Sequence, residues 1–91
     1  MSKWTYTLTK GKWLREAIED GDEQLVVKCL LACYKELYDK LTDEDKEWKG
    51  FDIEDVIGCL EYYDEDEGDN IDYYLAEFYD LCDELRAWVT L

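Results

Sequence analysis

The N-terminal part of the chain contains a short alternating pattern followed by a helical one. Trp4, Tyr6 and Leu8 alternate with threonines, which is typical of a β-strand because successive side chains point to opposite faces. Gly11 interrupts this alternation, and apolar residues recur at helical spacing in residues 13–20, just before a second glycine. We therefore expect a short strand and then a short helix.

A longer amphipathic helix is predicted from about Asp22, whose carboxylate can cap free amide groups, to about residue 41. Residues 42–50 are rich in charge and end in a glycine, so we interpret them as a connection. The apolar positions of this helix, which should face the core, are Leu25, Val26, Cys29, Leu30, Cys33, Leu37 and Leu41.

Two more helices are predicted in the second half of the chain. Asp52 is interpreted as the N-cap of the first, and the acidic segment 64–70 as the loop that follows it. The second helix should extend from Ile71 to Val89. The apolar positions of the first are Ile53, Val56, Ile57, Leu60 and Tyr63. Those of the second are Ile71, Tyr74, Leu75, Phe78, Leu81, Cys82, Leu85, Trp88 and Val89.

These elements predict a mostly α-helical fold. The absence of proline and the short connections favour a small antiparallel helical bundle of about four helices, and the first residues allow a short N-terminal β-strand. No repeat or linker divides the chain, so we expect residues 1–91 to form a single acidic helical domain. The hydrophobic content of 47% is too high for a disordered acidic tail.

The charge of the chain is strongly negative and unevenly distributed. Ten basic residues stand against 25 acidic ones, a formal net charge of -15. Residues 1–50 hold nine basic and 11 acidic residues, whereas residues 51–91 hold one and 14. Such a field repels nucleic acids and anionic membranes and favours basic partners. We therefore expect no direct nucleic-acid binding and no membrane partner.

The cysteines and the N-terminal residues indicate a cytoplasmic protein. Neither a membrane-spanning run nor a basic segment followed by an apolar stretch is present. Each cysteine occupies an apolar position in a helical pattern, which is typical of reduced core thiols. Zinc binding by all four is the alternative, but the paired short spacing usual at zinc sites is missing. The cysteines are Cys29, Cys33, Cys59 and Cys82.

Catalytic and metal-binding patterns are weak. Histidine is absent, which removes the commonest general base and metal ligand near neutral pH. If Asp64 is placed at position 1 of a calcium-binding EF-hand loop, Asp69 falls where glycine is required and Leu75 where glutamate is required. We therefore expect no enzyme activity, no cofactor and no metal site, although weak cation binding by the acidic loop is an alternative.

The two C-terminal helices should carry an acidic face. Residues 52–84 contain 14 Asp and Glu but no Lys or Arg, and tyrosines stand among the carboxylates where they can contact or stack on arginine. Residues four apart on a helix rise about 6 Å, close to the roughly 7 Å between successive phosphates of a nucleic-acid strand. The predicted partner-binding residues are Glu54, Asp55, Glu61, Tyr62, Glu65, Asp69, Asp72, Tyr73, Glu77, Tyr79, Asp80, Asp83 and Glu84.

This acidic region resembles the small DNA-mimic inhibitors made by phages and mobile elements, including anti-CRISPR and antirestriction proteins. The resemblance is one of composition and covers mainly residues 52–84. It implies a non-catalytic inhibitor that occupies the basic groove of a nucleic-acid-binding protein, with carboxylates in place of phosphates. These inhibitors share no single fold or motif, so the resemblance assigns no role to an individual residue.

Other functions compete with this interpretation. The chain also fits a small adaptor or regulatory subunit that binds a protein through an apolar face, either as a monomer or as a homodimer. Trp4, Trp13 and Trp48 are candidates for such a face. An ordinary solvated acidic surface, whose tyrosines close the edge of a thin core, is a further alternative.

Overall fold

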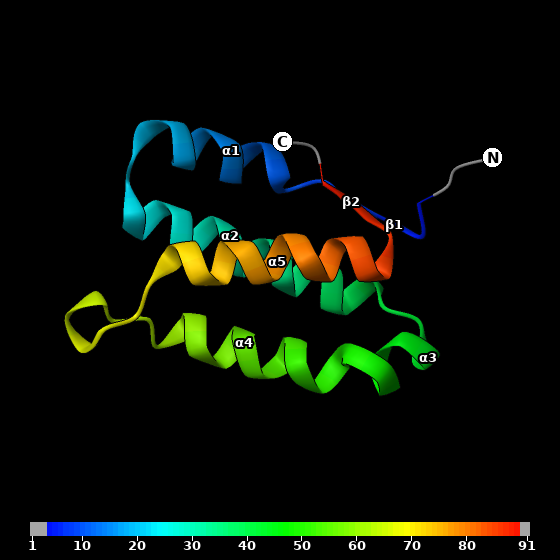
Figure 1. Ribbon diagram of the computed structural model, residues 1–91. Helices are drawn as coiled ribbons and strands as arrows, with labels where there is room; N and C mark the ends of the chain where they lie inside the picture. The colour runs from blue at the N-terminus through cyan, green and yellow to red at the C-terminus, as the bar shows by residue number, and fades with distance from the viewer. Residues whose placement is uncertain (1–3, 90–91) are drawn as a thin grey trace.

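In the computed structural model, which describes residues 4–89, the longest helix lies at the centre of the domain and the other long helices pack against it (Figure 1). A mostly helical fold with four such helices and a short two-stranded sheet is therefore confirmed for these residues. None of their helices combines the length and apolar character needed to cross a membrane. The four helices are α1 (Gly11–Asp20), α2 (Glu23–Lys40), α4 (Phe51–Glu61) and α5 (Ile71–Leu85).

Helices α1 and α2 form a tight hairpin. Gly11 starts α1 rather than merely ending the strand, and Gly21 ends it with a φ of 71° while donating its N–H to Ala17 and Ile18 carbonyls. Helix α2 begins as predicted, because the Asp22 carboxylate accepts a hydrogen bond of 3.2 Å from a first-turn N–H. The two helices are thus joined by only two residues.

Residues 43–50 are helical, so the prediction of a connection over residues 42–50 is wrong. The Thr42 hydroxyl accepts a hydrogen bond of 3.2 Å from the N–H of Asp45 and thereby starts α3 (Asp43–Asp45). The chain continues through the π-helical segment η1 (Lys46–Gly50) directly into α4. Asp52 lies inside the first turn of α4 and is therefore not an N-cap, because Gly50 keeps helical dihedral angles.

The two ends of the described chain pair as a parallel sheet. Strand β1 (Tyr6–Leu8) confirms the N-terminal strand, and its partner is β2 (Ala87–Val89). Helix α5 ends at Leu85 because Arg86 adopts a left-handed conformation, with a φ of 56°. The prediction that α5 reaches residue 89 is therefore wrong. The apolar residues 87 and 89 fit the two-residue period of a strand, and residue 89 also fits the period of a helix. Pairing with β1 favours the strand over a continued helix.

The core lies where α2 meets its neighbours. Tyr34 of α2 and Phe78 of α5 pack edge to face, with ring centroids 5.0 Å apart. Leu25 is exposed, because it lies in the first turn of α2, which corrects its predicted place in the core. Of the cysteines, Cys33 and Cys82 are buried, Cys29 is half-buried and Cys59 is exposed at the surface of α4, which corrects the core assignment of the last.

The acidic loop between α4 and α5 has its own short structure. It contains a 3-10 turn, η2 (Glu65–Glu67), and Gly68 ends that turn with a φ of 95°. The Asp64 carboxylate accepts a hydrogen bond of 2.9 Å from the N–H of Asp66, and Asn70 caps α5 through the N–H of residue 72. The loop lies at one end of the domain (Figure 1).

Candidate functional site: an acidic groove between two helices

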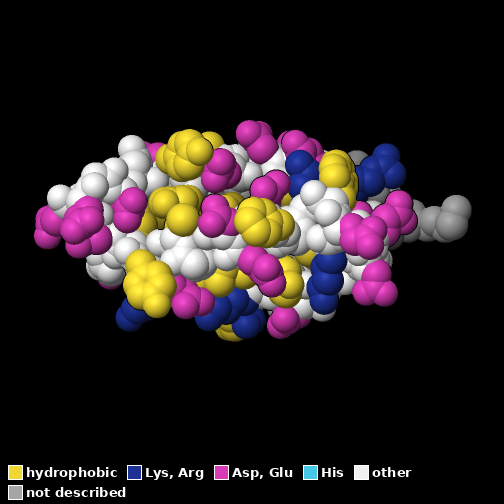
Figure 2. All heavy atoms as spheres, turned by 90° about the horizontal axis from the view of Figure 1, so that it is seen from below, with side chains coloured by type: hydrophobic (Ala, Val, Ile, Leu, Met, Phe, Trp, Pro, Cys, Tyr) yellow, Lys and Arg dark blue, Asp and Glu magenta, His cyan; other side chains and the backbone are white. Residues whose placement is uncertain are grey.

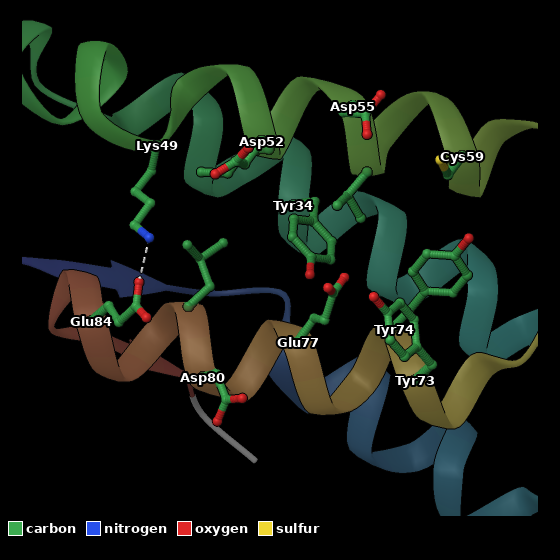
Figure 3. Close-up of a pocket in the computed structure, with 13 residues that line it drawn as sticks. Tyr34, Lys49, Asp52, Asp55, Cys59, Tyr73, Tyr74, Glu77, Asp80 and Glu84 are labelled. Carbon is green, nitrogen blue, oxygen red and sulfur yellow. Dashed lines mark ion pairs between the residues drawn. The ribbon is translucent and has the colours of Figure 1, made fainter.

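A groove of about 540 Å³ separates α4 from α5. Both helices pack on α2, so the space between them has α2 as its floor (Figure 3). Its apolar lining comes from Ile53 and Val56 of α4 and Leu81 of α5. The groove is therefore apolar at its base and polar along its two walls.

Carboxylates from both helices line these walls. Asp52 and Asp55 come from α4, while Glu77, Asp80 and Glu84 come from α5 (Figure 3). Positions 77, 80 and 84 recur at intervals of three and four residues, so they share one side of α5. Helical geometry alone brings these α5 carboxylates to one side of α5, where Glu77 and Glu84 extend toward α4 and Asp80 lies at the outer edge (Figure 3).

One end of the groove contains a cation. The Lys49 ammonium of η1 lies 2.6 Å from the Glu84 carboxylate, and the Lys49 side chain is only 21% exposed (Figure 3). The sequence had suggested an acidic face without cations, and the structure corrects this by folding η1 against it. Among the described residues that line the groove, Lys49 is the one basic residue, so the remaining carboxylates keep a net negative charge.

Aromatic residues close the opposite end. Tyr73 and Tyr74 of α5 lie edge to face, with ring centroids 5.6 Å apart, and both line the groove (Figure 3). A hydrogen bond to the Glu77 carboxylate raises the pKa of Tyr73. The Tyr74 pKa is raised first by burial, and its hydroxyl is hydrogen bonded to Cys59 across the groove. This end therefore offers aromatic rings and hydroxyl groups beside a carboxylate.

Tyr34 forms the floor at the middle of the groove. Its side chain is 1% exposed, and its hydroxyl points from α2 toward Glu77 (Figure 3). Burial, together with the negative charge of Glu77, raises the pKa of Tyr34, so this hydroxyl stays protonated. The Tyr34 hydroxyl thus reaches the groove as a neutral polar group.

The structure brings only part of the predicted face into this groove. Five of the 13 predicted partner-binding residues line it. They are Asp55, Tyr73, Glu77, Asp80 and Glu84.

Two predicted residues of α4 face α2 instead. Glu54 accepts a hydrogen bond of 2.5 Å from the Tyr38 hydroxyl, and Glu61 lies 3.6 Å from the Lys35 ammonium. Basic and polar groups of α2 therefore engage part of the charge that the sequence assigned to one continuous face. The helical period of α4 separates these two carboxylates from Asp55.

The predicted loop residues lie at the end of the domain. Glu65 is hydrogen bonded to Glu23 at the start of α2, which raises the pKa of Glu65 and lowers that of Glu23. Asp69 accepts a hydrogen bond of 2.9 Å from the N–H of Asp64 and so closes the loop. Tyr62, at the end of α4, is 84% exposed. These residues form a separate acidic end rather than an extension of the groove.

The remaining predicted residues lie on other sides of α5. Tyr79 is directed toward α1, where it lines a shallow surface hollow with Arg15 and Ile18. Asp72 and Asp83 are exposed and do not line the groove. Seen from the α4 side in Figure 2, acidic side chains are interleaved with hydrophobic ones and gather densely at the loop end.

Sequence reasoning missed four important lining residues. The sequence predicts Asp52 as a helix cap, and the inner positions it predicts for α2 do not include Tyr34, although Tyr34 follows Leu30 by four residues. Tyr74 was assigned only to the core. Lys49 was placed in a connection, and only the helical course of η1 brings it to the groove.

Metal chemistry has no organised site in the described region. Among residues 4–89, no group of three or more Cys, Asp or Glu side chains is arranged to hold a metal ion. Burial raises the pKa of both Cys33 and Cys82 to about 12, so these thiols stay protonated and are poor ligands. Within the described lining, the groove therefore combines several carboxylates with one basic residue.

Comparison with known proteins adds no relative to this picture. The chain matches no family model, no curated protein and no solved structure. The groove must be interpreted from its own geometry.

Proposed function

We propose that the protein is a non-catalytic inhibitor that mimics a nucleic acid and occupies the basic groove of a nucleic-acid-binding protein. The observation that supports this proposal most directly is the pair of acidic walls of the groove, contributed by α4 and α5, with Lys49 as the one basic residue among the described lining. Carboxylates so arranged attract Arg and Lys side chains and speed association with a basic surface.

The spacing along α5 supports the same proposal. Successive carboxylates at positions 77, 80 and 84 are separated by rises of about 4.5 to 6 Å. A nucleic-acid strand presents phosphates at a comparable interval. The exposed Asp72 and Asp83 extend the charge beyond the groove. A basic surface that binds phosphates would therefore meet a row of negative groups.

A specific observation also favours an adaptor that binds through an apolar surface. Phe51 is 79% exposed at the start of α4, and the neighbouring Trp48 is 57% exposed. Large exposed aromatic side chains of this kind are common at protein interfaces. Binding through Phe51 and Trp48 would depend little on salt, whereas binding through the groove would depend on it strongly.

Capture followed by displacement separates the two functions. The immobilised protein is incubated with a cell lysate at low salt, and the retained proteins are challenged with duplex DNA. The mimic requires that a retained nucleic-acid-binding protein be released by DNA, and by raising salt from about 50 to about 200 mM. Retention that survives both treatments would contradict the mimic and favour the adaptor.

A matched pair of variants tests where the partner binds. Asp55→Lys with Asp80→Lys reverses one charge on each wall, and retention should fall sharply. Glu16→Lys with Asp20→Lys makes the same charge change on the exposed surface of α1 and should have little effect. Equal loss in both variants would show that bulk net charge, not the groove, governs binding.

A further inference from the structure

The base of the groove carries one polar group that is not a carboxylate, the hydroxyl of Tyr34. Tyr34 is only 1% exposed, yet its hydroxyl points into the groove (Figure 3). This hydroxyl makes no hydrogen bond within residues 4–89. An unpartnered hydroxyl at the base of an acidic groove is a free acceptor and donor for a ligand. This feature is independent of the carboxylates themselves.

The groups around this hydroxyl suit a planar cation. The Glu77 carboxylate lies on the side to which the hydroxyl points, and Tyr73 lies beside it as a ring (Figure 3). A guanidinium presents five N–H donors in one plane and stacks on aromatic rings, whereas an ammonium is a compact, strongly hydrated charge. A carboxylate, a hydroxyl oxygen and a ring therefore favour arginine over lysine.

Lys49 shows that the groove accepts a cationic side chain. Its ammonium is seated against Glu84 at one end, at 2.6 Å. The Glu77 and Tyr34 position lies further along the groove, about two helical turns from Glu84 along α5. The chain thus fills one cation position with its own residue and leaves another for a partner.

The length of the groove limits what it can hold. Its α5 lining extends from Tyr73 to Glu84, which corresponds to about 16 Å of helix. An extended peptide advances about 3.3 Å per residue, so about five residues fit along this length. The volume of about 540 Å³ is larger than one side chain requires, which agrees with a short segment rather than a single amino acid.

We propose that the groove binds a short extended segment of the partner and that an arginine of this segment inserts its guanidinium between Tyr34 and Glu77. This inference rests on the proposed function, because it identifies the kind of side chain through which the basic partner is recognised. Arginine then hydrogen bonds to the Glu77 carboxylate and the Tyr34 hydroxyl oxygen, while Tyr73 covers one face of its plane.

The test uses two acetylated and amidated five-residue peptides, Ala-Arg-Ala-Arg-Ala and Ala-Lys-Ala-Lys-Ala, titrated into the full chain at low salt and followed by calorimetry or NMR. We expect the arginine peptide to bind at least about fivefold more tightly. Glu77→Gln should weaken it about tenfold, and Tyr34→Phe should remove most of the preference for arginine. Equal affinity for both peptides would overturn the proposal.

Matched controls separate this position from general charge. Glu16→Gln removes the same charge on the exposed surface of α1, and Tyr79→Phe removes a hydroxyl that faces α1; both should leave the arginine preference unchanged. If Glu16→Gln weakens the peptide as much as Glu77→Gln, the arginine position is refuted. Tyr34→Phe retains the ring that packs on Phe78, and its melting temperature verifies that it folds.

The two experiments distinguish an error in the proposed arginine position from an error in the proposed mimicry of a nucleic acid. If DNA releases the captured protein but the arginine preference is absent, the mimic stands and the Tyr34 position is wrong. If the peptides behave as expected but DNA does not release the captured protein, the arginine position stands and the mimic is wrong.

Discussion

The two helical hairpins of this domain are closed to different degrees. Helices α1 and α2 are joined by two residues and pack directly, with Leu14 and Ala17 of α1 fully buried. Helices α4 and α5 are joined by a longer acidic loop and leave a groove between them. The side chains that face the gap explain the difference. Closing α4 on α5 would bring carboxylates of both helices together with Lys49 as the one basic residue among the described lining, which is electrostatically unfavourable.

The comparison suggests that an open groove can be encoded by charge rather than by a special backbone. Each of α4 and α5 still buries an apolar side on α2, through residues such as Ile53 and Phe78. The same two helices line the groove between them with carboxylates. Contacts with α2 therefore hold both helices in place while the groove between α4 and α5 stays open.

The largest expected effect comes from breaking the attachment of α5 to α2. Phe78 is 0% exposed, so Phe78→Ala should lower the free energy of unfolding by about 3 to 5 kcal/mol and can unfold so small a domain. Urea denaturation measures the change. Tyr62→Ala, at a residue that is 84% exposed, is the control and should be nearly neutral. A Phe78→Ala variant as stable as its parent would contradict the central role of this contact.

The closed hairpin has a polar contact that should depend on pH. The Glu36 carboxylate of α2 accepts hydrogen bonds from the Thr9 N–H at 2.9 Å, the Thr9 hydroxyl at 2.7 Å and the Lys10 N–H at 3.2 Å, just before α1. Burial opposes ionisation of Glu36, but the bonds from Thr9, Lys40 and Lys10 outweigh it, and the pKa of Glu36 is lowered. The folded protein therefore favours the ionised form.

Glu36→Gln should lower the free energy of unfolding by about 1.5 to 3 kcal/mol at neutral pH. Because the folded pKa lies below the unfolded value, this contribution is complete above the unfolded carboxyl pKa and is lost as pH falls through the folded pKa. Denaturation from pH 7 to pH 3 measures it. A difference between Glu36→Gln and its parent that is constant over this range would exclude the ionic contribution.

A smaller change should strengthen the open hairpin without closing it. Gly58 lies inside α4, does not line the groove, and a Cβ there would meet no atom within 4 Å. Gly58→Ala should therefore raise the free energy of unfolding by about 0.5 to 1 kcal/mol through helix propensity. Peptide binding should be unchanged. Weakened binding in a stabilised Gly58→Ala protein would indicate that the groove depends on flexibility of α4.

The smallest expected effect tests the charge explanation itself. Asp55→Asn with Asp80→Asn removes one negative charge from each wall and should raise the melting temperature slightly at low salt. The gain should disappear at high salt, where the carboxylates of the parent are already screened. Gln24→Ala, at an exposed residue of α2, controls for surface substitution. A lower melting temperature at low salt would show that these carboxylates stabilise the fold instead.

Local pattern predicted much of the fold. The Asp22 cap, the strand at Tyr6 and the buried side of α5 around Phe78 all follow from spacing and side-chain chemistry. The errors lie where pairing between distant residues overrides local preference. The β1 strand captures residues 87–89, and the Tyr6 hydroxyl, 2.5 Å from the Asp45 carboxylate, helps to fix α3 in a segment that reads as a connection.

The candidate site was less predictable than the fold. The period of α5 identifies Glu77, Asp80 and Glu84 as neighbours, so these residues were found. The sequence could not show that Glu54 and Glu61 turn toward α2, because that depends on how α4 is rotated. The groove floor was also missed, because the inner positions predicted for α2 do not include Tyr34 and the gap above it depends on how α4 and α5 pack.

The pairing of β1 with β2 has a consequence for how the domain resists force. The strands are parallel, with Tyr6 opposite Ala87 and Leu8 opposite Val89. A pull on the chain before β1 and after β2 acts along the strands in opposite directions, so it loads their hydrogen bonds together in shear rather than one after another. Although each strand has three residues, their pairing makes this small sheet a mechanical clamp across the helices between them.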